Sequence, residues 1–108
     1  MKTINIIEDF TNIPGARHIE DGPFSGEAFR ETCLEPCFAN PADNEEIVIV
    51  LDGLEGYPVS FLDEAFGGLA RRHGSERVLR RLRFVSKENP LLIETITGYI
   101  KDPDWKTR

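Results

Sequence analysis

Few residues in this sequence have the types and spacing that catalysis requires. A hydrolytic triad needs a histidine base beside its serine, and the two histidines are His18 and His73. His73 follows Ser60 by 13 residues on one predicted helix, which separates them by about 20 Å at 1.5 Å per residue. His18 lies near Asp21 in a charged stretch typical of a surface. The glycine-rich phosphate loops, the hydrolase elbow and the HExxH motif are absent. We therefore predict a non-enzymatic protein without a cofactor.

The cysteines do not indicate a metal site. Cys33 and Cys37 are four residues apart, and a structural zinc ion needs about four ligands at characteristic spacings. The N-terminal segment lacks the apolar run of a signal peptide, so we expect a cytoplasmic protein with two free, half-buried thiols. The longest apolar run, residues 47–51, is too short to cross a bilayer.

Charge is distributed unevenly along the 108 residues, which is the length of one domain. Residues 1–70 carry 14 acids and 3 bases, a net −11, whereas residues 71–108 carry 10 bases and 5 acids, a net +5. The basic excess centres on Arg71, Arg72, Arg77, Arg80, Arg81 and Arg83. No aromatic residues are interleaved with these arginines, so we expect pairing with the acidic half rather than nucleic-acid binding.

Periodicity and turn residues predict an α/β sandwich with a mixed sheet of about four strands. Strands are expected at 3–7, weakly at 17–19, at 46–51 and at 83–86. The β-branched run 46–51 is typical of a central strand covered on both faces. Helices are expected at 26–34, 60–73, 75–82 and 90–100, with N-caps at Ser25, Ser60, Ser75 and Asn89. Pro36 is expected to end the first helix, and residues 101–108 are expected to form a loose tail.

The most informative stretch is residues 51–69, where the central strand leads through a loop into a helix. Open α/β sheets present ligands and partners at the carboxyl ends of their strands. Asp63 stands at the capping-box position after Ser60, and Asp63 and Glu64 are expected on the exposed face of the helix. Gly67 and Gly68 in mid-helix each cost about 1 kcal/mol relative to alanine, so something is expected to approach closely there.

Ser60 has two interpretations at this junction. A phosphate on Ser60 would meet free backbone N–H groups at the positive end of the helix. It would also add about −1.5 to −2 charge beside Asp63 and Glu64, which together would make a switch. In the alternative, Ser60 is only a helix cap.

Two motifs resemble a known family: Gly-Pro-Phe-Ser-Gly-Glu-Ala-Phe-Arg at residues 22–30, and Ser-Phe-Leu-Asp-Glu-Ala-Phe-Gly-Gly-Leu at residues 60–69. Together they resemble a bacterial STAS-like family of unknown function, and more loosely the STAS domains of sulfate transporters and anti-sigma-factor antagonists. The resemblance implies a sheet with helices mainly on one face and a protein partner, often a histidine-kinase-like ATPase. In true antagonists that ATPase phosphorylates a serine in an Asp-Ser-Ser-Gly loop. Here Ser60 falls on the second serine of that motif, and Val59 occupies the usual phosphoacceptor position.

The leading hypothesis is a regulatory protein-binding module, a monomer or weak homodimer in which Ser60 is the candidate phosphoacceptor. Its predicted partner contacts are Gly53, Gly56, Tyr57, Pro58, Ser60, Asp63, Glu64, Gly67 and Gly68. A second hypothesis is an acidic protein, such as one from a mobile element, that sequesters a partner without a switch. A third is nucleotide binding by the loop at residues 52–60.

Overall fold

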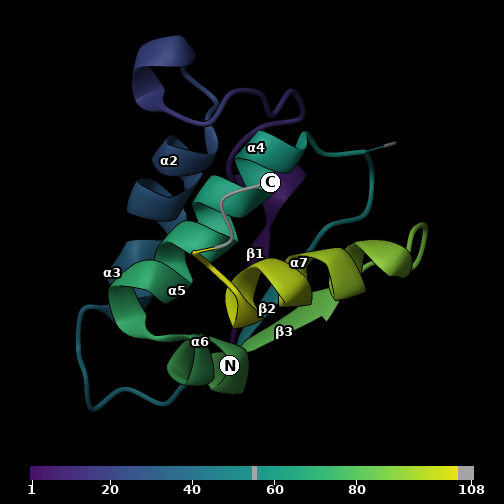
Figure 1. The fold of residues 1–108 in the computed structure, drawn as a ribbon. Coiled ribbons are helices and arrows are strands. Elements are labelled where there is room, and N and C mark those ends of the chain that lie inside the picture. Colours follow the sequence, from purple (N-terminus) through teal and green to yellow (C-terminus); the bar gives the residue numbers. More distant parts are fainter. Residues whose placement is uncertain (55, 105–108) are drawn as a thin grey trace.

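Three parallel strands form the sheet of this protein in a computed structural model that describes residues 1–54 and 56–104. The strands β1 (Lys2–Asn5), β2 (Ile47–Val50) and β3 (Leu82–Val85) lie in the order β1-β2-β3 (Figure 1). Their register aligns Ile4, Ile49 and Phe84 across the sheet. The run at 46–51 was therefore predicted correctly as a central strand.

The predicted mixed sheet of about four strands is wrong for the described residues, which form three parallel strands. Residues 17–19, predicted as a strand, precede and enter the 3₁₀ helix η1 (Ile19–Asp21). The carbonyls of Ala16 and Arg17 accept the N–H groups of Gly26 and Glu27, at 3.1 and 3.0 Å. This backbone therefore closes the start of a helix instead of pairing with a strand.

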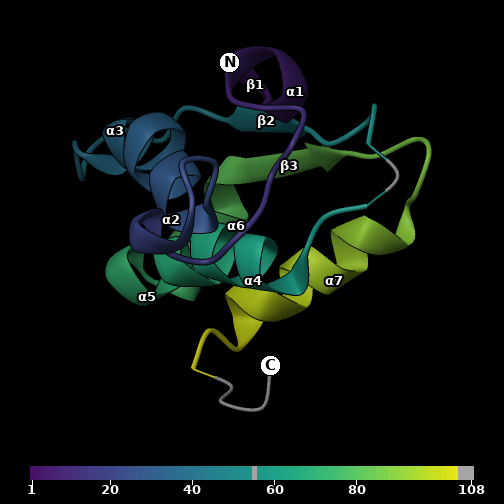
Figure 2. The ribbon, with the colours of Figure 1, turned by 90° about the horizontal axis from the view of Figure 1, so that it is seen from above.

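The sheet is covered mainly on one face. Side chains on that face are buried: Ile4, Ile47, Ile49 and Leu82. On the other face Thr3 and Arg83 are exposed, and Val48 and Val50 are half-buried. Figure 2 shows helices α2, α4, α5 and α7 on one side of the strands. The prediction that residues 46–51 are covered on both faces is therefore wrong, because β-branched residues favour any strand and do not report which of its faces is buried.

Two long helices pack side by side against the buried face of the sheet. The first comprises α2 (Gly26–Phe29), the π-helical turn η2 (Arg30–Leu34) and α3 (Glu35–Phe38). The second comprises α4 (Val59–Leu62), the π-helical turn η3 (Asp63–Gly67) and α5 (Gly68–His73). Gly26 lies against the backbone carbonyl of Phe61, so no side chain fits at this crossing.

Ser25 caps the first long helix as predicted, because its Oγ accepts the Ala28 N–H at 3.1 Å. The prediction that Pro36 ends this helix is wrong, since the helix continues to Phe38. Pro36 directly follows the π-helical turn, and the backbone on both sides of it keeps helical angles.

The remaining helices are α1 (Ile6–Asp9), α6 (Ser75–Arg81) and α7 (Leu91–Lys101). The predicted caps Ser75 and Asn89 are each displaced by one residue, because Gly74 and Pro90 are the N-cap residues. Helix α7 extends one residue into the predicted tail, and residues 105–108 of that tail lie outside the described residues. Among the helices of the described ranges, none combines the length and apolar character needed to span a membrane.

The arginine cluster pairs within the molecule, as predicted. Arg72 contacts Glu35 at 2.6 Å and Arg83 contacts Glu46 at 3.6 Å. Arg81 is itself buried: it donates to the carbonyls of Glu45 and Cys37 at 2.9 and 2.6 Å and lies over the Phe38 ring.

Candidate recognition site

The loop that follows β2 is held at its base by the turn that follows β3. The Leu51 N–H donates to the Val85 carbonyl at 2.9 Å, which extends the pairing of the two strands. The Asp52 carboxylate accepts the Glu88 N–H at 2.9 Å, and the Gly53 N–H donates to the Glu88 carboxylate. The pKa of Asp52 lies below its usual value, chiefly because of the hydrogen bond from the Glu88 backbone. The two turns therefore fix each other.

Gly53 directs the chain away from the end of β2. Its φ of +107° lies in a region that glycine adopts readily and side-chain-bearing residues rarely adopt. A β-carbon at this position would also collide with the Ile7 side chain, which follows β1. The loop therefore begins with a close approach between the carboxyl ends of two neighbouring strands.

Tyr57 connects the far end of the loop to the end of β2. Its hydroxyl donates to the Leu51 carbonyl at 2.9 Å, and its ring lies 6.1 Å from the Phe61 ring. Burial, together with the nearby carboxylates of Asp52 and Glu88, raises the pKa of Tyr57 to about 12. Tyr57 thus supports the loop from inside and is half-buried.

The second long helix begins at Val59, one residue before the predicted start. Pro58 is the N-cap residue, with an extended ψ of 140°, and its side chain makes no capping hydrogen bond. Ser60 is half-buried in the first turn, so its prediction as an N-cap is wrong: the residue before it is already helical. Val59 is 51% exposed beside this uncapped end.

Asp63 and Glu64, predicted to face solvent, are buried at 6% and 8% exposure. Arg17 contacts the Asp63 carboxylate at 2.7 Å, and Arg30 forms a short ion pair with Glu64. Arg71 lies 3.7 Å from Glu64 on the other side. The first long helix and the loop before it cover the face that helical periodicity alone assigned to solvent, so these carboxylates hold the fold together.

The two mid-helix glycines are also buried, and the close approach expected there is confirmed. A β-carbon on Gly68 would overlap the Arg30 guanidinium, and one on Gly67 would crowd the Asp63 carboxylate at 2.8 Å. Both glycines make room for side chains of this chain.

Those of the nine predicted contact residues that reach the surface therefore lie in one short segment. Gly53, Gly56 and Pro58 are exposed and Ser60 is half-buried. We call residues 53–60, apart from residue 55, the recognition loop. The predicted set did not include Val59, which is exposed in this segment, or Glu88, which supports the loop. Glu88 was recognisable only with the parallel pairing of β2 and β3, which places the turn after β3 beside the end of β2.

Comparison with known families places this geometry in context. A family model described as a STAS-like domain of unknown function matches residues 25–92, from the Ser25 cap to the start of α7, and includes the recognition loop. The chain belongs to this STAS-like family. The match covers more than half of the chain, and β1 precedes the matched segment of the STAS-like domain. No curated protein and no solved structure matches this chain.

Proposed function

We propose that this STAS-like domain is a non-catalytic regulatory module that binds a protein partner through the recognition loop. The observation that carries the proposal is Val59, a large apolar residue that is 51% exposed beside a helix end whose N-cap residue, Pro58, makes no side-chain cap. An apolar side chain together with the backbone N–H groups of a first helical turn suits a protein surface that offers an apolar pocket and hydrogen-bond acceptors.

The support beneath the loop favours binding. Glu88 and Tyr57 hold its two ends, at Gly53 and at the Leu51 carbonyl. A loop that is already ordered loses less conformational entropy when a partner binds, which leaves more of the contact energy for affinity.

Ser60 is the candidate regulatory residue. A phosphate on this first-turn side chain would lie near backbone N–H groups that Pro58 does not cap, at the positive end of the helix. Asp63 and Glu64 were expected to repel it, but Arg17 and Arg30 pair with them. The modified state would thus be tolerated by the domain, and its added charge would act on the partner. A histidine-kinase-like ATPase is the partner class that the STAS resemblance suggests.

The two alternatives receive less support. The sequestering hypothesis relied on exposed acids, and two of these, Asp63 and Glu64, are buried and paired. For nucleotide binding, the carboxylates of Asp52 and Glu88 lie at the base of the loop, where they would repel phosphate groups.

Photo-crosslinking tests the proposal. A benzophenone amino acid is placed at Val59, and in a matched control at Leu91, which is 69% exposed at the start of α7. In host cells, the Val59 probe is expected to form one defined adduct that the Leu91 probe does not form, and mass spectrometry identifies the partner. Identical adducts at both positions, or none at Val59, would contradict the proposal.

A further inference from the structure

Strand β1 has one outer edge that pairs with no other strand among the described residues. The Lys2 N–H donates inward to the Glu46 carbonyl at 3.0 Å. Because successive residues of a strand direct their backbone groups to opposite edges, the N–H and carbonyl of Thr3 point outward. The next outward N–H, that of Asn5, is taken by the Asp9 carboxylate at 2.7 Å. The free edge thus offers one donor–acceptor pair, at Thr3, and ends at Asp9.

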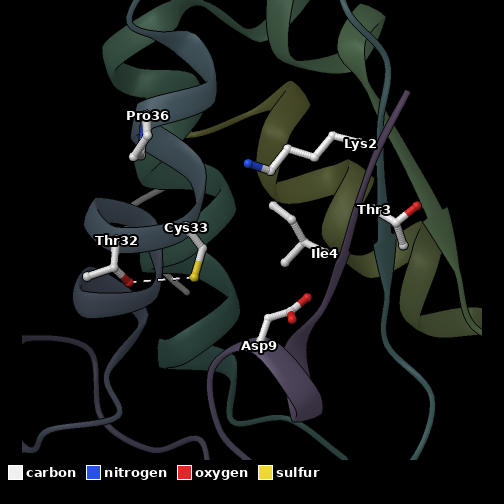
Figure 3. A pocket seen from close by; sticks show the side chains of 7 residues that line it. All are labelled: Lys2, Thr3, Ile4, Asp9, Thr32, Cys33 and Pro36. Atoms are coloured by element: carbon white, nitrogen blue, oxygen red, sulfur yellow. Dashed lines mark hydrogen bonds between the residues drawn. The ribbon is translucent and has the colours of Figure 1, made fainter.

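A groove of about 300 Å³ runs between this edge and the first long helix (Figure 3). It is lined by Lys2, Thr3, Ile4, Asp9, Thr32, Cys33 and Pro36. In Figure 3 the side chains of Lys2 and Ile4 point toward the helix, whereas that of Thr3 points away. Thr3 therefore lines the groove with its backbone, which is the part of a residue that an added strand uses.

The two ends of the groove carry opposite charges. Lys2 stands at the start of β1 and Asp9 follows its end, and both side chains are exposed. Between them lie Ile4 and the Cys33 thiol, whose pKa is raised chiefly by burial, so this stretch is uncharged at neutral pH. A ligand that complements the groove carries a base at the Asp9 end, small apolar residues in the middle and an acid at the Lys2 end.

We propose that this groove binds an extended segment of a partner protein, which adds to the sheet as a fourth strand antiparallel to β1. In an antiparallel sheet one residue exchanges both hydrogen bonds with the residue opposite, which matches the single outward pair of Thr3. The segment then runs from a basic residue near Asp9 to an acidic residue near Lys2. Main-chain pairing supplies affinity and the groove supplies specificity, as in other cases of strand addition.

A second copy of this chain fits the groove less well than a single segment does. Pairing of two β1 edges about a twofold axis would place both helix layers on the same face of the joined sheet. The helix wall formed by Thr32, Cys33 and Pro36 stands where the second layer would have to lie. The groove is also separate from the recognition loop, so each proposal can fail without the other.

The test uses two synthetic peptides and ¹⁵N-labelled protein. Acetyl-Lys-Val-Thr-Val-Glu-amide has the predicted polarity, and acetyl-Glu-Val-Thr-Val-Lys-amide reverses its charges. At about 1 mM peptide, where weak complexes are populated, the first is expected to shift the amide signals of β1 and of residues 32–36. It is also expected to slow hydrogen exchange of the Thr3 amide at least tenfold, and the reversed peptide is expected to bind at least threefold more weakly.

Variants separate this mode from nonspecific binding. Thr3→Pro removes the outward donor and leaves the inward ladder donors intact, and Cys33→Trp fills the groove; each is expected to weaken binding at least tenfold. The double variant Lys2→Glu/Asp9→Lys should invert the preference between the two peptides. Ser60→Ala, in the recognition loop, should leave peptide binding unchanged.

The proposal is overturned if neither peptide shifts the β1 signals, or if both variants at Thr3 and Cys33 bind like the unmodified protein. It is also overturned if the same signals shift on concentrating the protein alone, because the occupant would then be a second copy.

Discussion

The guanidinium of Arg30 reaches across the two long helices to Glu64, where it meets both the carboxylate and the backbone carbonyl, the latter at 3.1 Å. It lies directly over Gly68, one turn further along the second helix. This contact explains two features together: Gly68 inside a helix and the buried carboxylate of Glu64. Both can be tested by substitution.

Gly68→Ala is expected to destabilise the domain by about 1–3 kcal/mol, because the new methyl group displaces the Arg30 guanidinium from a packed site. This outcome opposes intrinsic helix propensity, which favours alanine by about 1 kcal/mol. Gly98→Ala in helix α7 is the matched control, since nothing lies within 4 Å of its β-position, and it should stabilise. Urea unfolding measures both. A Gly68→Ala variant as stable as Gly98→Ala would contradict the packing described.

Breaking the buried ion pair should cost more than removing it entirely. Arg30→Met alone leaves the Glu64 carboxylate buried with only the longer contacts to Arg17 and Arg71, and we expect a loss of about 3 kcal/mol. The double variant Arg30→Met/Glu64→Leu removes both charges and should recover most of that loss. Chemical denaturation gives the coupling energy, and a double variant less stable than the sum of the two single changes would refute the assignment.

Tyr57 should make the stability of the domain fall in strong alkali. Its pKa in the folded state is raised to about 12, whereas tyrosine in an unfolded chain has a pKa of about 10. The folded state therefore holds the phenolic proton more tightly, so this stabilisation is complete below pH about 10 and is lost as the pH rises toward 12. Tyr57→Phe should lose this part of the pH dependence and about 1 kcal/mol from the missing hydrogen bond to Leu51. Unfolding free energies at several alkaline pH values decide the matter, and an unchanged alkaline slope in Tyr57→Phe would contradict it.

Local features of the fold were predictable because they depend on neighbouring residues. Ser25 caps the helical turn that directly follows it. The β-branched run at 46–51 forms the central strand. The two sequence motifs were sufficient to indicate the STAS-like family. The cost of Gly67 and Gly68 in a helix also predicted a close approach correctly, although not its source in Arg30 and Asp63.

The rest depended on contacts between distant segments. Asp63 and Glu64 lie opposite the apolar stripe of their own helix, and only the position of Arg17 and Arg30, which precede them by 46 and 34 residues, shows that this face is buried. The prediction of Ser60 as an N-cap was wrong for a local reason. A cap depends on the backbone angles of the neighbouring residues, and the helix begins one residue earlier than predicted, at Val59. Because of this shift of one residue, Val59 is exposed and Ser60 is half-buried.

Charge at Ser60 should act on the partner rather than on the domain. Because Arg17 and Arg30 already pair with Asp63 and Glu64, Ser60→Asp is expected to change the unfolding free energy by less than about 0.5 kcal/mol. It should nevertheless change partner affinity at least tenfold, whereas Ser60→Ala should not. Calorimetry with the crosslinked partner measures affinity, and thermal unfolding measures stability. Ser60→Asp and Ser60→Ala variants that both bind like the unmodified protein would end the switch hypothesis.

The central claim, that the recognition loop binds a protein partner, is tested most directly by the affinity of the Val59→Asp variant for the partner identified by crosslinking. A charge at this half-exposed position should leave the fold intact and weaken binding at least tenfold, about 1.4 kcal/mol. Leu91→Asp, at a more exposed apolar position on α7, should bind normally. Equal affinity of Val59→Asp and the unmodified protein would contradict the account.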